Sequence, residues 1–477
     1  MANIIWEPQP QQVKFMQRSE YEALYGGAAG GGKSDSLLVE ATRQVMIPHY
    51  KGIIFRKTFP QLADLIDRSY ELYKHSFPRA VYNTSGHYWT FPSGAKIYFG
   101  NMQRVQDRTK YQGRRFDFVA FDELTHFTWE EYSYMYSRNR PGGPGTRVYM
   151  RATANPGGIG HGWVKNHFIT AAKPMTTIKQ KLSVVDPEGK LVEMERNRIF
   201  VPATVFDNKK LLQNDPNYLA NLALLSEKDR NALLYGDWDS FSGQVFTEWR
   251  NDPQGYETQR FTHVIKPFNI PSHWRIYRGY DFGYAKPFSF GWYAVSEDNT
   301  IYRIAEYYGC TGAPNEGLKI EAQQQAREAK RIEREHPLLK GKRILGIADP
   351  AIFDKSRGDS IGEIMEKEGL YFEPGDHTRI PGKMQFHNRF AFDEEGKAML
   401  YIFNTCNHFI RTIPSLVYSQ THVEDIDTSQ EDHIYDECRY VLMAHPVGPR
   451  KNVLAEPMKY NPLDTEPVIQ YDKFYRV

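Results

Sequence analysis

The stretch GAAGGGKS at residues 27–34 decides the fold of the first part of this chain. It matches the phosphate-binding loop pattern of a glycine, four residues and then Gly-Lys-Ser. Residues 23–25 form an apolar run typical of a short strand, and apolar residues after the loop recur on one face of a helix. Glycines let backbone N–H groups turn toward phosphate oxygens, and the helix N-terminus adds its dipole. The pattern predicts a nucleoside triphosphate site built from Gly27, Gly30, Gly31, Gly32, Lys33 and Ser34.

Charged and hydroxyl side chains would carry the chemistry of this site. We expect Lys33 to reach the outer phosphates and the Ser34 hydroxyl to ligate Mg²⁺. Hydrolysis also needs carboxylates, and the apolar run Phe118–Phe121 ends in two of them, Asp122 and Glu123. We expect Asp122 to bind the Mg²⁺ through water and Glu123 to polarise the attacking water. The sequence therefore predicts a hydrolase site for ATP with Mg²⁺.

Further polar residues are candidates for the same site. The next predicted strand ends in Thr153, Ala154 and Asn155, where a polar side chain can sense the γ-phosphate and relay hydrolysis to movement. Near the N-terminus, Gln12 is a candidate for binding the adenine edge through its amide. A solvated N-terminal glutamine run is the alternative interpretation of that residue.

Phosphoryl transfer usually needs an arginine on the developing charge. Arg56 can act within the same subunit. Arg138 and Arg140 lie past the acidic pair, next to the glycine-rich stretch 140–145. We expect that stretch at the ligand-bearing edge of the sheet, where a neighbouring subunit can be reached. The sequence does not choose among the three arginines.

Length and composition limit the class of protein. A chain of 477 residues exceeds one ordinary core, so two or three domains are expected. The net charge of +2 means that any basic groove for nucleic acid must be local. Three widely separated cysteines (Cys310, Cys406, Cys438) indicate a reducing compartment without a disulfide framework. The chain lacks a signal-peptide pattern and a run long enough to span a bilayer, so we expect a soluble intracellular protein.

Short apolar runs alternate with helical stretches from about residue 20 to 155, which predicts a mostly parallel α/β sheet. A more polar region follows, and a second α/β pattern starts near residue 275. We therefore divide the chain into an ATPase core (1–180), a small lid subdomain (181–245), a linker (246–270) and a second α/β domain (271–477).

Three aspartates in the second α/β pattern suggest another site. Asp281 and Asp349 each follow an apolar strand, and Asp436 lies on a predicted helix. Aspartates at buried strand ends are costly unless they are paired or bound to metal. If the three converge, they can hold two divalent cations that clamp a phosphodiester, and oxygen-only ligands favour Mg²⁺ or Mn²⁺. Each aspartate can instead be an ordinary turn or cap residue.

The ordered set of motifs resembles the large terminase subunits of tailed bacteriophages, and the resemblance runs along nearly the whole chain. The residues that carry it are the loop 27–34, Phe55-Arg56-Lys57-Thr58, Phe121-Asp122-Glu123-Leu124-Thr125, Thr153-Ala154-Asn155-Pro156, Leu234-Tyr235-Gly236-Asp237-Trp238, Asp281-Phe282-Gly283, Asp349-Pro350, and Asp436 with Arg439-Tyr440.

The resemblance implies a P-loop ATPase with a small lid, followed by a nuclease similar to ribonuclease H. It implies ATP-driven translocation of double-stranded DNA into a procapsid, with endonucleolytic cutting of concatemeric DNA. Asp281, Asp349 and Asp436 resemble the metal-binding nuclease triad, and Thr153–Asn155 resemble the coupling motif. The implied partners are DNA, the portal protein, a small terminase subunit and further copies in a ring on the portal, with a monomer as the alternative when free. The implied location is the host cytoplasm, transiently at the portal, with no membrane partner.

One feature departs from the family pattern. Many relatives carry an arginine inside the phosphate-binding loop, whereas this loop has only small residues before Lys33. We therefore hypothesise a finger that acts in trans from Arg138 or Arg140, which requires an oligomer. The competing functions are an ATP-dependent helicase or repair nuclease acting on cellular DNA, and a nucleotide-binding scaffold without enzymatic activity.

Overall fold

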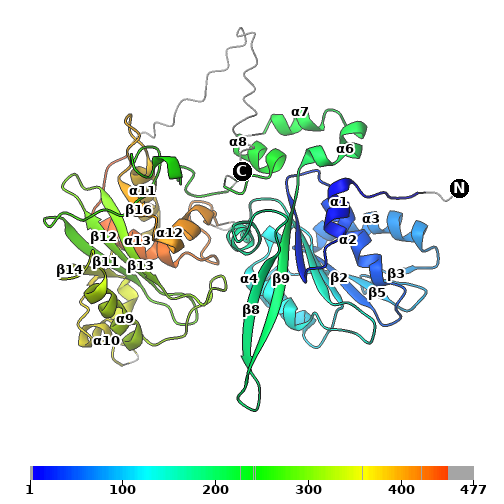
Figure 1. Cartoon of the computed structure of the whole chain (residues 1–477), viewed down its shortest axis with the longest axis horizontal. Coiled ribbons are helices and arrows are strands. Elements are labelled where there is room, and N and C mark those ends of the chain that lie inside the picture. Colours follow the sequence, from blue (N-terminus) through cyan, green and yellow to red (C-terminus); the bar gives the residue numbers. More distant parts are fainter. Residues whose placement is uncertain are drawn as a thin grey trace, which may run out of the picture.

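The computed structural model describes residues 4–225, 227–239, 241, 243–356, 358–419 and 422–449. The last part of the predicted second domain, residues 450–477, lies outside the described residues. Two α/β lobes lie side by side, each built on its own sheet (Figure 1). No helix in the described ranges has the length and apolar character needed to cross a membrane.

The N-terminal lobe contains a nine-stranded sheet in the order β3-β4-β5-β2-β6-β7-β1-β9-β8. Its central strands run parallel, and β3, β4 and β8 are antiparallel additions at the two sides. The predicted strand at 23–25 is confirmed as the longer β1, and the apolar run Phe118–Phe121 is confirmed as β6. The strands are β1 (Glu22–Gly27), β2 (Lys51–Arg56), β3 (Val81–Asn83), β4 (Tyr88–Thr90), β5 (Lys96–Asn101), β6 (Phe118–Phe121), β7 (Tyr149–Ala154), β8 (Ile178–Val185) and β9 (Leu191–Ala203).

Helices cover both faces of this sheet because its central strands are buried on both sides. Apolar residues of α1 (Pro10–Met16), α2 (Lys33–Ala41) and α3 (Phe59–Ser76) pack on one face. Those of α4 (Trp129–Tyr134) and α5 (His161–Val164) pack on the other. The carboxyl ends of the parallel strands therefore meet at one open edge, where the phosphate-binding loop follows β1.

Short helices form a cap beside the phosphate-binding loop. They are α6 (Lys209–Asn214), α7 (Tyr218–Ala223) and α8 (Glu227–Arg230), followed by a π-helical turn, Asn231–Tyr235 (Figure 1). Gly236 ends this turn in the left-handed region, which glycine adopts most readily. The predicted lid also included residues 181–203, but these form β8 and β9, a hairpin that extends the sheet and projects from the lobe. Because β8 and the first half of β9 are exposed, their sequence lacks the apolar runs that mark the buried strands of this sheet.

The C-terminal lobe contains a seven-stranded sheet in the order β10-β16-β13-β12-β11-β14-β15. Strands β11, β12 and β13 form an antiparallel meander, and β14 and β15 add in parallel beside β11. This is the ribonuclease H arrangement that the family resemblance implies, extended by β16 and β10. The strands are β10 (Val264–Ile265), β11 (Arg275–Asp281), β12 (Ser289–Val295), β13 (Ile301–Tyr308), β14 (Ile344–Ala348), β15 (Glu373–Pro374) and β16 (Leu400–Phe403).

Helices of the C-terminal lobe share one large apolar core with its sheet. They are α9 (Ala322–Glu335), α10 (Ile361–Lys367), α11 (Arg379–Phe390), α12 (Asn407–Thr412) and α13 (His433–Ala444). The predicted linker 246–270 belongs to this core, since Phe246, Ile265 and Ile270 are buried in it and β10 pairs with β16. Its apolar residues are too irregularly spaced to show a period in the sequence.

Candidate nucleotide and nuclease sites

The phosphate-binding loop joins β1 to α2, as predicted. Gly32 adopts φ +68°, and a Cβ there would lie 2.5 Å from Nε2 of Gln12, so this position requires glycine. The N–H groups of Gly30, Gly31 and Gly32 find no acceptor in the part of the chain that the structure describes. Three unpaired amides beside a helix N-terminus fit the binding of phosphate oxygens.

Gln12, on α1, forms a hydrogen bond with the phosphate-binding loop. Its Nε2 donates to the Gly32 carbonyl (2.7 Å), and its Oε1 accepts from the Gln9 backbone N–H (2.7 Å). The side chain is buried. Both ends of the amide are therefore engaged by the protein, so Gln12 braces the loop in this structure, and the predicted adenine contact stays a prediction.

Asp122 is the centre of the charged network at the loop. It is buried, and its Oδ2 accepts from the Ser34 hydroxyl (3.0 Å) and from Nε of Arg56 (2.7 Å), while its Oδ1 accepts from the Thr153 hydroxyl. A carboxylate and a serine hydroxyl in direct contact are a donor set that fits Mg²⁺. Asp122, Ser34, Arg56 and Thr153 thus meet as the sequence predicts.

Asn155 connects the loop lysine to the second acid. Its Oδ1 accepts from Nζ of Lys33 (2.8 Å), and its Nδ2 lies 3.3 and 3.4 Å from the two carboxylate oxygens of Glu123. Lys33 also donates to the carbonyl of Ala28. Burial lowers the pKa of Lys33, and the Glu123 and Asp122 carboxylates oppose that shift. The lysine is therefore held beside the acids by a side chain that directly follows β7.

Glu123 has a backbone conformation that is unusual for a residue other than glycine. Its φ of 58° and ψ of 56° are left-handed, which costs energy for a residue with a Cβ. Its N–H donates to the Thr153 hydroxyl (3.3 Å). A strained residue directly after a buried strand is typical of functional positions. The backbone turn directs the Glu123 side chain toward Asn155, in agreement with its predicted role beside the phosphates.

Arg138 and Arg140 lie at the opposite edge of the sheet. The Arg138 carbonyl and the Arg140 N–H pair with Phe116, which precedes β6, whereas Asp122 follows that strand. The stretch 140–145 leads into the start of β7, so the expectation that it lies at the ligand-bearing edge is wrong. Neither arginine can reach the loop of its own subunit. The trans role stays a prediction.

The three predicted nuclease aspartates gather around β11. Asp281 ends β11, and Asp349 follows the parallel neighbour β14, with its N–H donating to the Tyr280 carbonyl (3.2 Å). Helix α13, which carries Asp436, packs across β11 and β12. Burial raises the pKa of Asp281 to about 7, and repulsion from Asp436 and Asp349 adds to the shift.

Two further residues, Asp432 and His433, adjoin this triad. Burial and repulsion from Asp436 raise the pKa of Asp432 to about 8. Nδ1 of His433 lies 3.4 Å from Oδ2 of Asp281, and burial alone would lower its pKa, but the Asp281 carboxylate raises it. Asp432 lies one turn before Asp436, a spacing that the sequence displays, whereas nothing in the sequence marks His433.

The carboxylates fit divalent cations in donor type and in charge. Oxygen-only ligands favour Mg²⁺ or Mn²⁺, and acids that raise one another's pKa gain from a bound positive charge. In the described ranges, however, no group of three or more His, Cys, Asp and Glu side chains is close enough to hold a metal ion. The aspartates would have to move together around an ion.

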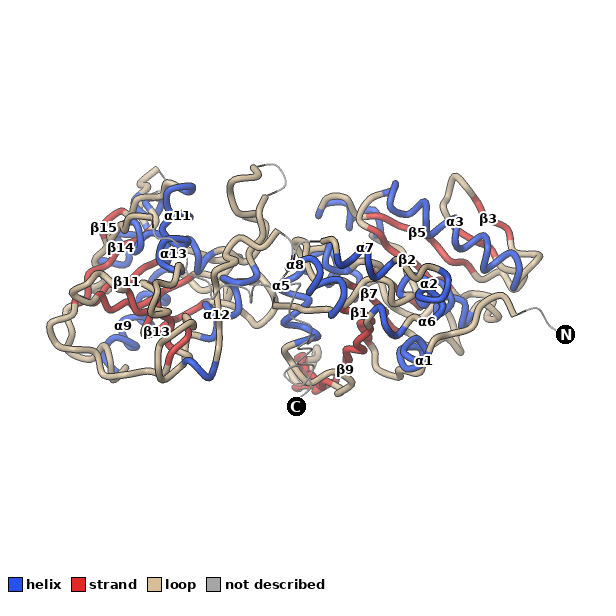
Figure 2. Tube along the Cα trace, turned by 90° about the horizontal axis from the view of Figure 1, so that it is seen from above, coloured by secondary structure: helices blue, strands red, loops and turns tan. Residues whose placement is uncertain are grey.

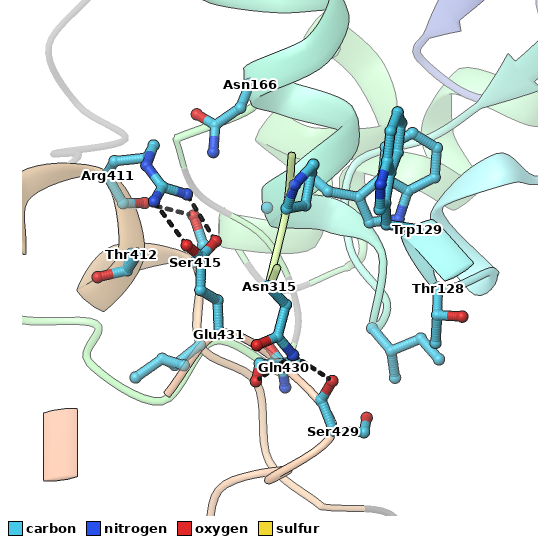
Figure 3. A pocket seen from close by; sticks show the side chains of 15 residues that line it. Thr128, Trp129, Asn166, Asn315, Arg411, Thr412, Ser415, Ser429, Gln430 and Glu431 are labelled. Atoms are coloured by element: carbon cyan, nitrogen blue, oxygen red, sulfur yellow. Dashed lines mark hydrogen bonds and ion pairs between the residues drawn. The ribbon is translucent and has the colours of Figure 1, made fainter. Parts of the chain in front are cut away.

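A small pocket lies where the two lobes meet (Figure 3). Figure 2 shows α5 and α12 facing each other there, and Gly162 of α5 lies close to Ser415 after α12. Trp129 and Trp163 line the pocket from the N-terminal lobe. Its volume of about 70 Å³ is too small for a nucleotide. The pocket is therefore a feature of the contact between lobes.

Side chains of the C-terminal lobe connect this pocket to the nuclease aspartates. Arg411 pairs with Glu431 at 2.6 and 2.7 Å (Figure 3). Asn315 donates to the Gln430 carbonyl (3.1 Å), and its Oδ1 lies 3.0 Å from Nε2 of His433. Since His433 also contacts Asp281, a short series of contacts joins the lobe boundary to the triad.

Comparison with known proteins gives one family and several structures. Residues 24–250 match the family model described as "Terminase large subunit, T4likevirus-type, N-terminal". No curated protein matches the chain significantly. The match spans the phosphate-binding loop, the acidic pair and residues 153–155.

Three solved structures illustrate the likeness. The large terminase of a thermophilic bacteriophage is 15% identical, with 93% of this chain and 100% of that chain covered and a TM-score of 0.38. The large terminase of bacteriophage HK97 is 10% identical, with 92% and 95% covered and a TM-score of 0.45. The nuclease domain of the P22 large terminase is 18% identical, with 43% and 92% covered and a TM-score of 0.31.

Proposed function

The chain belongs to the terminase large subunit family, and from this premise we propose that it hydrolyses ATP to translocate double-stranded DNA into a procapsid and cuts that DNA. The observation that supports this best is the presence of two sites on one chain. One is a phosphate-binding loop with an acid pair, and the other is an aspartate cluster on a ribonuclease H-like sheet.

In the ATP site, each residue has a role that its contacts support. The loop amides and Lys33 would bind the phosphates, and Ser34 and Asp122 would hold Mg²⁺, which supplies charge neutralisation when bound. Glu123 would orient the attacking water and accept its proton at a carboxylate oxygen. Asn155 is positioned to respond to the phosphate, because it contacts both Lys33 and Glu123.

In the nuclease site, Asp281, Asp349 and Asp436 would hold divalent cations, Mg²⁺ or Mn²⁺, which supply the charge needed for phosphodiester hydrolysis. Asp281 would be the central ligand, because it ends β11, which pairs with β14 before Asp349 and packs against α13, the helix that carries Asp436. We propose further that the subunit works as a ring on the portal protein, with a small terminase subunit as an additional partner.

Paired variants test the two activities separately. Glu123→Gln is expected to abolish ATP hydrolysis while ATP binding persists, and the exposed Glu130→Gln is the matched control. Asp349→Asn is expected to abolish cutting of plasmid DNA in Mn²⁺, with the exposed Asp354→Asn as control. Cutting that persists in Asp349→Asn would contradict the nuclease proposal, and hydrolysis that persists in Glu123→Gln would contradict the ATPase proposal.

A packaging motor and a helicase differ in the product of movement. A packaging motor moves duplex DNA without separating its strands, so no unwound product is expected from a forked DNA substrate with ATP. Strand separation that depends on Lys33 would favour a helicase. The C-terminal ribonuclease H-like sheet supports the packaging function, because a helicase would normally carry a second helicase domain there.

A further inference from the structure

Two arginines meet one carboxylate of the proposed nuclease triad. Arg439 lies one turn after Asp436 on α13 and donates to its Oδ1 through Nη2 (2.7 Å) and Nε (3.2 Å). Arg379 begins α11, with its Nη1 3.5 Å from the same oxygen and its Nε 2.5 Å from Oδ2 of Asp425. Positive charge thus lies directly beside the acidic cluster.

Each guanidinium keeps one nitrogen without a partner. Nη1 of Arg439 and Nη2 of Arg379 are enclosed, and neither finds a hydrogen-bond acceptor within the part of the chain that the structure describes. The Arg439 side chain is 3% exposed and the Arg379 side chain 30% exposed. Enclosed donors without acceptors are rare in folded proteins and need an explanation. A ligand with several acceptor oxygens would provide one.

Local packing fixes the position of Arg439. Gly382 of α11 faces it, and a Cβ at that position would lie 2.4 Å from Cδ and 2.5 Å from Cγ of Arg439. The stem of the arginine therefore occupies the space that residue 382 leaves empty. Its guanidinium carbon also lies 5.0 Å from the ring centre of Tyr440. The two helices hold this side chain in one place beside Asp436.

We propose that Arg379 and Arg439 bind the phosphodiester backbone of duplex DNA at the nuclease site. The proposal rests on the proposed cutting of DNA by this lobe. A guanidinium presents several donors in a plane that matches phosphate oxygens, and the acidic cluster around Asp436 would otherwise repel a polyanion. Arg379 is the more exposed of the pair, so it makes the outer contact, and Arg439 makes the inner one.

The salt dependence of DNA binding tests the outer contact. The full chain is titrated against a fluorescein-labelled DNA duplex in EDTA, so that no cutting occurs, over a series of KCl concentrations. One lost phosphate contact lowers the slope of log affinity against log salt by about 1. Arg379→Gln is expected to show this loss together with weaker binding. Arg327→Gln, an exposed arginine on α9 paired with Glu368, is expected to keep the wild-type slope.

Two further measurements distinguish a contact with DNA phosphate from a role in holding or neutralising Asp436. Arg439→Lys keeps the charge but loses the planar donors, and it is expected to weaken DNA binding while its melting temperature stays near that of the wild type. Mn²⁺ binding by Arg379→Gln, followed by calorimetry, is expected to persist. A wild-type salt slope for Arg379→Gln would overturn the proposal. If the Mn²⁺ affinity of that variant changed as well, the arginine would only neutralise the charge of Asp436.

The two proposals fail in different ways. If Asp349→Asn still cuts plasmid DNA, the nuclease proposal fails whatever the salt slopes are. If the wild type cuts, Asp349→Asn does not, and Arg379→Gln keeps the wild-type slope, the phosphate-binding role alone is wrong.

Discussion

Replacing Asp281 by asparagine is expected to stabilise the metal-free chain at neutral and alkaline pH. Burial raises the pKa of this carboxyl from its ordinary value of 3.8 to about 7. Between those values the folded chain binds a proton that the unfolded chain has released, so the free energy of unfolding falls as the pH rises. From pH 5 to pH 8 the loss is about 3 kcal/mol, because it accumulates at about 1.4 kcal/mol for each pH unit and levels off above pH 7. The Asp281→Asn variant has no carboxyl at this position, so its free energy of unfolding does not fall in this way as the pH rises.

Urea unfolding in EDTA at pH 5 and pH 8 measures this difference. Because the chain has two lobes, pulse proteolysis with mass spectrometry of β11 and α13 peptides reads the C-terminal lobe separately. The advantage of Asp281→Asn over the wild type is expected to grow by about 3 kcal/mol between the two pH values. Asp376→Asn is the control, because the backbone N–H of Thr378 lowers the pKa of Asp376. That carboxyl is charged in the folded and unfolded chain from pH 5 to pH 8, so the difference between this variant and the wild type is expected to stay constant.

Two outcomes would refute this reasoning. An equal free energy of unfolding for Asp281→Asn and the wild type at pH 8 would mean that the Asp281 charge is already neutralised or solvated. An advantage that shrinks as the pH rises would mean that the pKa of Asp281 is lowered in the folded state. Saturating Mn²⁺ is expected to reverse the order at pH 8, because the wild type alone keeps all three carboxylates for the ion.

Three further substitutions have defined outcomes. Asn155→Ala removes the contacts with Lys33 and Glu123 and is expected to lower ATP turnover about a hundredfold while filter-bound ATP persists, since the proton acceptor loses its orientation. Gly236→Ala forces a Cβ to 2.7 Å from the backbone of the phosphate-binding loop at φ +67°, and steady-state kinetics are expected to show a raised KM for ATP. Burial lowers the pKa of His161 to about 3, so wild-type stability is full above pH 6.5 and declines below it. His161→Ala is expected to lose stability at pH 8, and its deficit in urea unfolding is expected to shrink by about 2 kcal/mol at pH 5.

The nucleotide site could be predicted from the sequence because its residues lie in the segments that follow strands. Ser34, Asp122 and Asn155 follow strands that turn out to be parallel neighbours, so one edge of the sheet collects them. For this site, the local pattern of an apolar strand followed by polar residues was sufficient to predict which residues meet. The same reasoning failed for the stretch 140–145, because a loop that enters a strand and a loop that leaves one have the same composition.

The nuclease site could be predicted only in part. Asp281 and Asp349 are marked by the apolar strands before them, and parallel pairing of β11 with β14 brings them together. Arg379 carries no such mark, because it reaches the site through the packing of α11 against α13. Arg439 is three residues from Asp436 on one helix, and that spacing alone indicates a contact. A contact such as that of Arg379, which depends on the packing of two distant helices, leaves no local pattern and therefore cannot be predicted from the sequence.

The position of the arginines constrains the ring that the motor would need. Arg56 is bound to Asp122 in the same subunit, so one positive charge is already present at the phosphate site. Arg138 and Arg140 lie at the amino ends of the strands, whereas the phosphate-binding loop lies at the carboxyl ends. A head-to-tail ring brings different surfaces of successive subunits together, and in such a ring the amino edge of one sheet can face the carboxyl edge of the next. A two-fold contact can also bring these edges together, but it pairs only two subunits, with each arginine serving the other's loop. A head-to-tail ring instead supplies every phosphate-binding loop with an arginine from its neighbour, so a finger in trans from Arg138 or Arg140 fits a cyclic motor of any size.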